Sequence, residues 1–346
     1  MTKPRKVIVA EPNPAWPAQF REEAERLSAV FGRQALYLHH IGSTSVPGLA
    51  AKPLIDILPV VRVLSAVDAL NPALEELGYE AMGEYGLPGR RYFRREEPPS
   101  PCHVHVYETG SPEILRHLAL RDYLRARPET AAEYGRLKAE LAARFPADID
   151  AYLDGKDAFL KQAEQVALAW WMRAVVLVLS GPVGVGKTTV ADALSQLLTE
   201  RHVAHALADL DALSELEPRS PGDRFASGFS LANLAVLFSN ARSCGARCLI
   251  VPRVMEDAGD VADVRAAIPG ADVVVVRLHA PLSTLEERLR RRERGDSLAW
   301  HLARAEELSQ ALERCGPADC VLEAIDSPET VAQRVLDVTG LLSRLA

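Results

Sequence analysis

The residues with the clearest capacity for chemistry lie in one stretch, VVLVLSGPVGVGKTT, at residues 175–189. An apolar, β-branched run gives way to a glycine-rich turn, and a helical pattern begins near Lys187. The spacing Gly-x-x-x-x-Gly-Lys-Thr is typical of a phosphate-binding loop, where backbone N–H groups and a helix N-terminus surround a phosphate. We therefore predict a nucleotide-binding loop made by Gly181, Gly184, Val185, Gly186, Lys187, Thr188 and Thr189.

Two side chains of this loop are expected to act on the nucleotide directly. The Lys187 ammonium can neutralise charge on the β- and γ-phosphates during transfer, and the Thr188 hydroxyl can hold Mg²⁺. ATP and Mg²⁺ are therefore the expected cofactors. The alternative is a glycine turn that binds nothing, and the preceding strand and following helix argue against it.

The loop must be positioned by the elements that follow one another from residue 174 onward. The pattern predicts a strand before the loop and four later strands, with helices between them, at residues 175–179, 205–208, 248–254, 272–278 and 320–322. Such alternation predicts an α/β domain, a parallel sheet with helices on both faces, whose ligands bind at the carboxyl ends of the strands.

Acidic side chains follow the second predicted strand. Asp211 is placed to accept a proton from a phosphoryl acceptor, and Asp209 to hold Mg²⁺. The alternative for both is a helix cap or a loop acid. The third strand carries no acid, and Arg253 at its end could grip a substrate or lie at the surface.

Residues 286–296 contain five arginines around a helix end and a glycine. Arginine forks suit phosphate oxygens, and a mobile arginine-rich segment could close over the nucleotide. We predict catalytic roles for Arg288, Arg291 and Arg292. The alternative is a solvated helix face with i,i+4 Glu/Arg pairs.

In the first half of the chain, Asp56 interrupts the apolar run at residues 54–61. A carboxylate within such a strand costs free energy unless something pairs with it. An acid beside a Gly-Ser turn such as Gly42-Ser43 is typical of nucleotidyltransferase metal sites, but the second acid expected two residues later is replaced by Leu58. Pairing of Asp56 with Lys52 or a backbone N–H is the alternative.

Residues 102–107 alternate, so His103 and His105 project to one face of a predicted strand. Two histidines on one face can bind a metal or an anionic substrate, or simply hydrogen-bond to neighbours. Lys156 and Lys161 are expected on solvated faces. The candidate site of this half comprises Gly42, Ser43, Lys52, Asp56, Arg91, His103 and His105.

The first half, from about residue 5 to residue 170, resembles the GrpB family in five motifs: His40–Ile57, Gly89–Phe93, His103–Val106, Arg121–Leu124 and Asp154–Phe159. The resemblance implies a nucleotidyltransferase-like α+β fold, sometimes fused to dephospho-coenzyme A kinase as an accessory folding domain. Here the order is reversed and the kinase-like half is not a close match to that enzyme, so coenzyme A is not carried over as a substrate.

The second half, at residues 173–346, resembles the small P-loop kinases, a group with adenylylsulfate, gluconate and shikimate kinases and antibiotic phosphotransferases. The resemblance implies two domains, 1–170 and 173–346, and an ATP-dependent phosphotransferase acting on a small hydroxylated metabolite or nucleotide. The alternatives are a nucleotide-gated binding or regulatory protein with slow ATP hydrolysis, and an active nucleotidyltransferase in the first domain. Leu58 counts against the latter.

The composition of the whole chain limits the kinds of binding partner and the cellular compartment to be expected. The net charge of −7 and the pI near 5.8 argue against a non-specific nucleic-acid binder. No stretch approaches the roughly 20 apolar residues of a membrane span, and the first residues lack the apolar core of a signal peptide. The five cysteines show no metal or disulfide spacing, which fits the reducing cytoplasm. The expected partner is a small-molecule phosphoryl acceptor.

Overall fold

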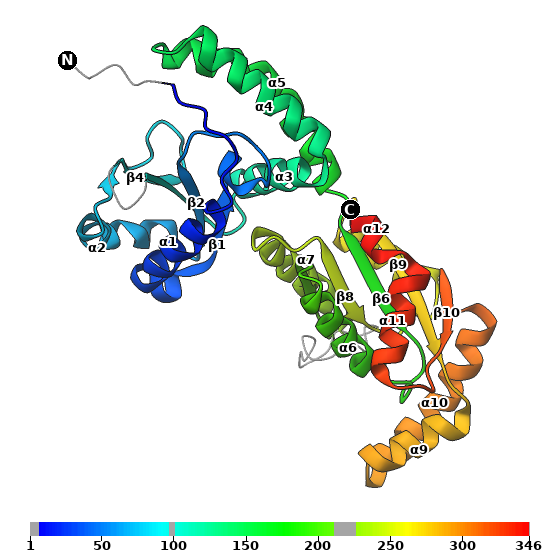
Figure 1. Cartoon of the computed structure of the whole chain (residues 1–346). Helices are drawn as coiled ribbons and strands as arrows, with labels where there is room; N and C mark the ends of the chain where they lie inside the picture. The colour runs from blue at the N-terminus through cyan, green and yellow to red at the C-terminus, as the bar shows by residue number, and fades with distance from the viewer. Residues whose placement is uncertain (1–6, 97–100, 211–225, 346) are drawn as a thin grey trace. The chain divides into compact units, whose positions relative to one another are not determined.

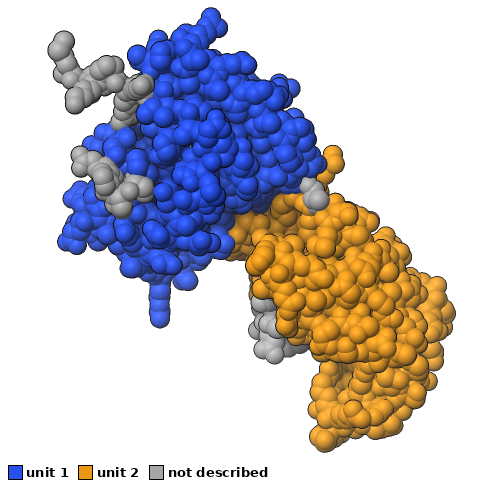
Figure 2. All heavy atoms as spheres, in the orientation of Figure 1, with its two compact units in different colours: residues 1–171 blue, residues 172–346 orange. Residues whose placement is uncertain are grey.

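The computed structural model describes residues 7–96, 101–210 and 226–345. The chain divides into two compact units, residues 1–171 and 172–346, shown in different colours in Figure 2. Each unit has its own sheet.

The first unit contains a five-stranded mixed sheet with the strand order β1-β2-β5-β4-β3. Strands β1, β2 and β4 of this sheet are labelled in Figure 1. Strands β2 and β5 run parallel, and the other neighbours are antiparallel. This arrangement confirms the α+β class. The strands are β1 (Ala35–Ile41), β2 (Ile55–Val61), β3 (Glu80–Ala81), β4 (Arg90–Arg95) and β5 (Cys102–Glu108).

Helices cover both faces of this sheet because its strands are apolar on both sides. On one face, Leu27 and Phe31 of α1 (Trp16–Phe31) and Leu74 of α2 (Asn71–Glu76) are buried against it. On the other, α3 (Pro112–Ala126) and α5 (Ile149–Trp171) pack, and α4 (Pro128–Arg144) contacts α5. Three short 3₁₀ helices complete the unit: η1 (Gly32–Gln34), η2 (Ser43–Ser45) and η3 (Leu64–Leu70).

The second unit contains five parallel strands in the order β10-β9-β6-β8-β7. They are β6 (Val175–Ser180), β7 (His205–Leu207), β8 (Cys248–Pro252), β9 (Asp272–His279) and β10 (Cys320–Glu323). Strands β7 and β8 lie on one side of β6, and the next two strands along the chain, β9 and β10, lie on its other side. Ligands bind at such a reversal point, outside the carboxyl ends of the strands, which here is the end of β6.

Helices lie on both faces of this sheet, as predicted. One face is covered by α6 (Lys187–Glu200), α11 (Pro328–Thr339) and α12 (Leu341–Leu345), and the other by α7 (Ser227–Ser243) and α8 (Ala258–Ala267). The remaining helices are α9 (Leu282–Arg292) and α10 (Gly295–Cys315). All six residues of β6 are buried, so the strand that leads to the loop is fixed from both sides.

Among the helices that the structure describes, none has the length and apolar character needed to cross a membrane.

Candidate functional sites

The glycine loop joins β6 to α6 and needs glycine for two reasons. Gly181, Gly184 and Gly186 have φ values of +144°, +84° and +101°, which other residues rarely adopt. At Gly181 a Cβ atom would also collide with the backbone carbonyl of Leu278. The backbone of the loop can therefore adopt this conformation only with glycine at these positions. The loop ends at Lys187, the first residue of α6.

Two polar side chains of the loop are held by hydrogen bonds, one to the loop backbone and one to a neighbouring carboxylate. The Lys187 Nζ atom donates to the carbonyl oxygens of Gly181 (3.0 Å) and Pro182 (3.2 Å), so the ammonium lies over the loop. The Thr188 Oγ1 atom donates to Asp209 Oδ2 at 3.2 Å. Two oxygen atoms of the kind that Mg²⁺ prefers as ligands, Thr188 Oγ1 and Asp209 Oδ2, thus lie together beside the loop.

A cleft of about 360 Å³ opens on one side of the loop, between α9 and the segment after β10. The loop lines it with Gly184, Val185 and Gly186, and its other walls are largely apolar, with two arginines and one carboxylate: Thr189, Val190, Arg288, Leu289, Arg292, Ala324, Asp326, Pro328 and Val331.

The three arginines expected to act on the nucleotide have different surroundings. Arg288 donates from Nη1 to the Val185 carbonyl and from Nη2 to the Ala324 carbonyl, both at 2.9 Å, so it ties the loop to the chain after β10. Arg292 lines the cleft and pairs with Glu293. Arg291 does not lie at the cleft: its side chain is 77% exposed and pairs with Glu287 one helical turn away. A catalytic role for Arg291 stays a prediction, because it requires the expected closure of this segment over the nucleotide.

A second pocket, of about 310 Å³, lies on the other side of the loop, where Val183 lines it. Its walls come from the residues after β7 and β8 and from α7, α8 and α10, namely Leu210, Ser227, Ser230, Arg253, Val254, Glu256, Asp260, Trp300, Arg304 and Leu308. Arg253 Nη2 donates to Ser227 Oγ at 3.1 Å, while Nη1 is buried without a hydrogen-bond partner among the described residues. Arg304, in contrast, pairs with Glu256 and Glu307. Asp211 lies outside the described residues.

In the first unit, Asp56 on β2 meets both histidines of β5. Its Oδ1 atom lies 3.3 Å from His105 Nε2 and 3.8 Å from His103 Nδ1. Gly42 lies against the same carboxylate, because a Cβ atom at Gly42 would collide with Asp56 Oδ2. Burial lowers the pKa of His103, which favours its neutral imidazole. Leu58, two residues along β2, is buried in the apolar cluster under α3 and α5.

Other candidates of this unit are separated from Asp56. Arg91 pairs with Asp68 on η3 (Nε to Oδ1, 2.5 Å), whereas its neighbour Tyr92 lies beside His103 and His105. Because side chains alternate along β4, Arg91 belongs to the opposite face of the sheet, and its assignment to the site is corrected. Ser43 is turned toward Lys138, which donates to its Oγ at 3.0 Å. Lys52 is exposed where the chain enters β2.

Lys156 was expected on a solvated face but is partly buried, with its Nζ 4.9 Å from the centre of the Tyr152 ring. Burial lowers its pKa, the charge of Asp56 acts in the opposite direction, and the charge of Lys52 lowers it further. The Lys156 ammonium is therefore within electrostatic reach of Asp56 and Lys52. Lys161, as expected, is exposed, and it pairs with Asp157.

Lys138 is a buried residue that the sequence reasoning missed. Only 3% of its surface is exposed, and its Nζ donates to Ser43 Oγ and to the Ala50 carbonyl, so it holds the segment that carries Gly42 and Ser43. Its position in the buried stripe of α4, formed by Ala131, Tyr134, Lys138 and Leu141, was the signal available. A lysine in an apolar stripe indicates a buried amine with specific acceptors.

We predict that Lys138 makes the stability of the first unit pH-dependent. Burial, and secondarily the charge of Lys156, lowers its pKa from 10.5 to about 7. The unfolded chain then binds more protons than the folded chain between these values, so this residue's contribution to the free energy of unfolding rises with pH across that window. Relative to Lys138→Met, the parent should gain up to about 1.4 kcal/mol per pH unit above pH 7 in urea unfolding. Parallel pH profiles for the two proteins would contradict the assignment.

The fold and the sites define the two halves of the molecule. The second unit is a P-loop, kinase-like domain, and the first carries the mixed sheet described above. The family model described as "GrpB protein" matches residues 6–166. The chain belongs to the GrpB family through this half: it is 32% identical to the glutamate-rich protein GrpB of Alkalihalophilus pseudofirmus over 161 residues, 45% of this chain and 92% of that protein.

Two further similarities complete the comparison. The chain is 48% identical over 166 residues to the protein YqkA of Bacillus subtilis, and the match covers 48% of each chain, about half the length of that relative. A solved structure similar to part of the chain is the Mycobacterium tuberculosis APS kinase CysC in complex with AMPPNP and APS. It shares 25% identity, covers 49% of this chain and 98% of its own, and has a TM-score of 0.37.

Proposed function

We propose that the second unit is an ATP-dependent phosphotransferase that acts on a small molecule. The observation that carries the proposal is the phosphate-binding loop at the carboxyl end of β6 with one pocket on each side. A group transferred between two substrates needs both of them in line at one point, and a loop that both pockets reach supplies that point.

The cleft beside α9 is assigned to the nucleotide. Its apolar walls, formed by residues such as Val190, Leu289 and Val331, suit a base and a sugar, while the loop N–H groups suit the phosphates. Thr188 and Asp209 are the residues that would hold Mg²⁺, which when bound neutralises charge on the phosphate oxygens. Lys187 and Arg292 would add positive charge where negative charge develops.

The pocket on the other side of the loop is assigned to the acceptor. The Arg253 Nη1 atom is buried without a hydrogen-bond partner in the part of the chain that the structure describes, and such a nitrogen costs free energy that an anionic group on the acceptor would remove. Arg253 therefore supports an acceptor that carries a phosphate, sulfate or carboxylate group in addition to its hydroxyl. Asp211, proposed from the sequence, would accept the proton of that hydroxyl.

The test of this function is a transfer screen. The purified chain, Mg²⁺ and ATP labelled in the γ-phosphate are incubated with a metabolite pool, and the labelled products are identified. We expect label on a small anionic molecule that bears a hydroxyl group. Release of labelled inorganic phosphate alone would favour the nucleotide-gated regulatory alternative.

We predict that Arg253→Ala raises the KM for the acceptor at least 10-fold and leaves the KM for ATP within about twofold. The reason is that the lost contact is to the acceptor's anionic group, which is worth about 1.5–3 kcal/mol when hydrogen-bonded to a charge. Steady-state kinetics with each substrate varied in turn measures both constants. The matched control is Arg290→Ala, since Arg290 is exposed and pairs with Glu286. An unchanged acceptor KM would remove Arg253 from the binding site.

A further inference from the structure

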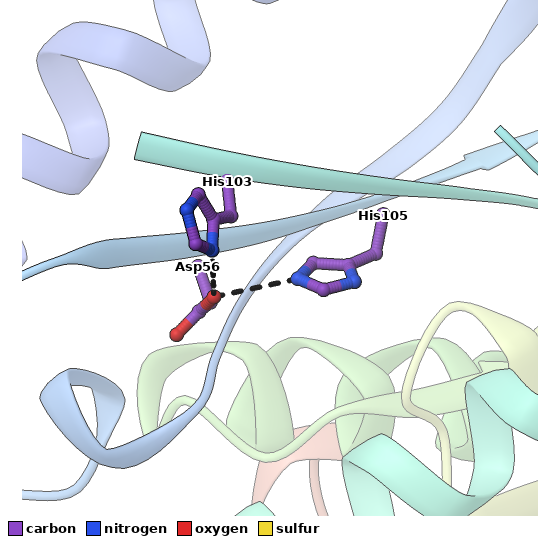
Figure 3. Close-up of side chains that lie close together, drawn as sticks. All are labelled: Asp56, His103 and His105. Carbon is purple, nitrogen blue, oxygen red and sulfur yellow. Dashed lines mark hydrogen bonds and ion pairs between the residues drawn. The ribbon is translucent and has the colours of Figure 1, made fainter. Parts of the chain in front are cut away.

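Asp56, His103 and His105 form a polar cluster in the first unit, and this cluster has no part in the proposed phosphotransfer. Figure 3 shows the Asp56 carboxylate and the two imidazoles pointing toward one another. One ligand atom from each of the three side chains lies within 4.8 Å of the others. The side chains are 23%, 17% and 15% exposed for Asp56, His103 and His105, so the cluster is largely shielded but open to a small solute.

The sheet fixes this cluster without help from a loop. Strands β2 and β5 are parallel neighbours, and their register pairs Asp56 with His103. His105 follows two residues later and therefore lies on the same face. Sites built on strands are more precisely held than sites built on loops, because backbone hydrogen bonds on both sides restrain each residue.

Each of the two imidazoles has a ring nitrogen that lacks a hydrogen-bond partner among the described residues. Among the described residues, His103 makes no hydrogen bond: its Nδ1 is 3.8 Å from Asp56 and its buried Nε2 has Glu96 Oε1 at 3.8 Å. His105 uses only Nε2, and its Nδ1 is buried without a partner. Two ring nitrogens thus converge on one carboxylate oxygen that only one of them hydrogen-bonds. A cation placed between the three side chains would accept a lone pair from each.

We propose that Asp56, His103 and His105 bind a divalent transition-metal ion, with Zn²⁺ as the ion best suited to two imidazoles and one carboxylate. Calcium and magnesium are disfavoured because they prefer oxygen ligands throughout. Ligand atoms in a tetrahedral zinc site lie about 3.3 Å apart, since the bonds are about 2.0–2.1 Å long. The Asp56–His105 pair already has this separation, and His103 needs a movement on the order of 1 Å.

Three protein ligands leave at least one coordination position open. This is the composition of zinc sites that bind a water or a substrate, rather than of closed structural sites, which have four protein ligands. Glu96, beside His103 Nε2, is placed as the outer carboxylate that often orients a ligating histidine. Gly42 leaves the space against Asp56 Oδ2 that a side chain would fill. The competing arrangement is an Asp56 that serves only as a counter-ion for Lys52, Lys156 and the imidazoles.

Metal binding to the full-length chain, without nucleotide, separates these two arrangements. The chain is stripped with a chelator and titrated with Zn²⁺ in competition with a chromophoric chelator, and bound metal is counted by mass spectrometry. Co²⁺ absorption reports the ligand type, because thiolate ligation by any of the five cysteines would add an intense charge-transfer band. We expect one Zn²⁺ per chain and a Co²⁺ spectrum without that band.

His103→Ala and His105→Ala should each weaken Zn²⁺ binding at least 100-fold, and Asp56→Asn at least 10-fold. His103→Asn and His105→Gln serve as second variants that retain side-chain volume, with circular dichroism to verify folding. The matched controls are His301→Ala in α10 and Asp68→Asn in η3, whose partner Arg91 lies on the opposite face of the sheet, and both should bind as the parent does. Failure of the parent to bind Zn²⁺, or equal binding by the His103 and His105 variants, would overturn the proposal. ATP-dependent transfer by the second unit would be unaffected by that outcome.

Discussion

Replacement of Lys187 by methionine is expected to lower ATP-dependent phosphoryl transfer by about 10²–10⁴-fold while the chain stays folded. The Lys187 ammonium lies over the loop on the carbonyls of Gly181 and Pro182, close to where phosphate oxygens would be held by the loop N–H groups. Methionine retains the aliphatic part of the side chain but cannot stabilise negative charge. The loss should therefore fall on kcat, because charge on the transferred group changes most in the transition state.

The measurement is kcat with the acceptor identified by the transfer screen, accompanied by circular dichroism. The fold should survive because the residues that anchor α6, Val190, Ala191 and Leu194, are all buried and unchanged. Gln196→Ala, on the exposed side of the same helix, is the matched control and should retain the parent rate. A Lys187→Met chain with full activity would remove the loop from the mechanism, whatever the acceptor is.

The largest effect on stability is expected at Glu23, where Glu23→Gln should lower the free energy of unfolding of the first unit by about 3–5 kcal/mol. Glu23 and Arg95 are a buried pair, with both side chains 4% exposed, joined by two hydrogen bonds of 2.6 and 2.9 Å. Tyr79 donates a third hydrogen bond to the same carboxylate at 2.8 Å. Glutamine keeps the shape but leaves the Arg95 charge buried and uncompensated.

Burial alone would raise the pKa of Glu23, but hydrogen bonds and charge from Arg95, with Tyr79, lower it below 4.5. Since the folded value lies below the unfolded one, the stability from this pair is present at neutral pH and is lost as the pH falls through the folded value. The acid-induced loss of stability should therefore be smaller in Glu23→Gln than in the parent.

Urea unfolding of the two proteins, in a Trp300→Phe background, isolates the first unit. The remaining tryptophans, Trp16, Trp170 and Trp171, all belong to that unit. Glu22→Gln, at the adjacent exposed position of α1, is the control and should change stability by less than about 0.5 kcal/mol. Adding Arg95→Met to Glu23→Gln should recover part of the loss, because the unpaired charge is removed. A loss that remains below 1 kcal/mol for Glu23→Gln would show that Arg95 finds other compensation.

Where a feature depended on neighbouring residues, it could be predicted. The strand of Val175–Ser180 and the start of α6 at Lys187 followed from periodicity and from turn residues. The glycines of the phosphate-binding loop were predictable because positive φ is a local requirement that few residues meet. The order of strands and helices along the chain gave the parallel sheet, since a strand and the next parallel strand need a crossing helix.

Features that depend on which strands become neighbours could not be predicted from the residue pattern of the sequence. The sequence grouped Asp56 with His103 and His105 in one candidate site, but it could not state that Asp56, 49 residues before His105, lies on the strand next to theirs. It placed Arg91 with them, although alternation along β4 puts Arg91 on the opposite face beside Asp68. It gave Lys138 no role, although burial lowers the pKa of that amine to about 7.

The sequence by itself therefore determined the alternating strands and helices of the second unit, the loop that follows β6 and, through the family resemblance, the α+β class of the first unit. Only the tertiary structure decided which polar and charged groups contact each other: Thr188 with Asp209, Arg288 with the loop backbone, and Asp56 with two imidazoles. The physical reason is the separation along the sequence of the residues that interact. Backbone angles and periodicity are set by residues a few positions apart, whereas the distance between two side chains depends on strand register and on packing across the whole core.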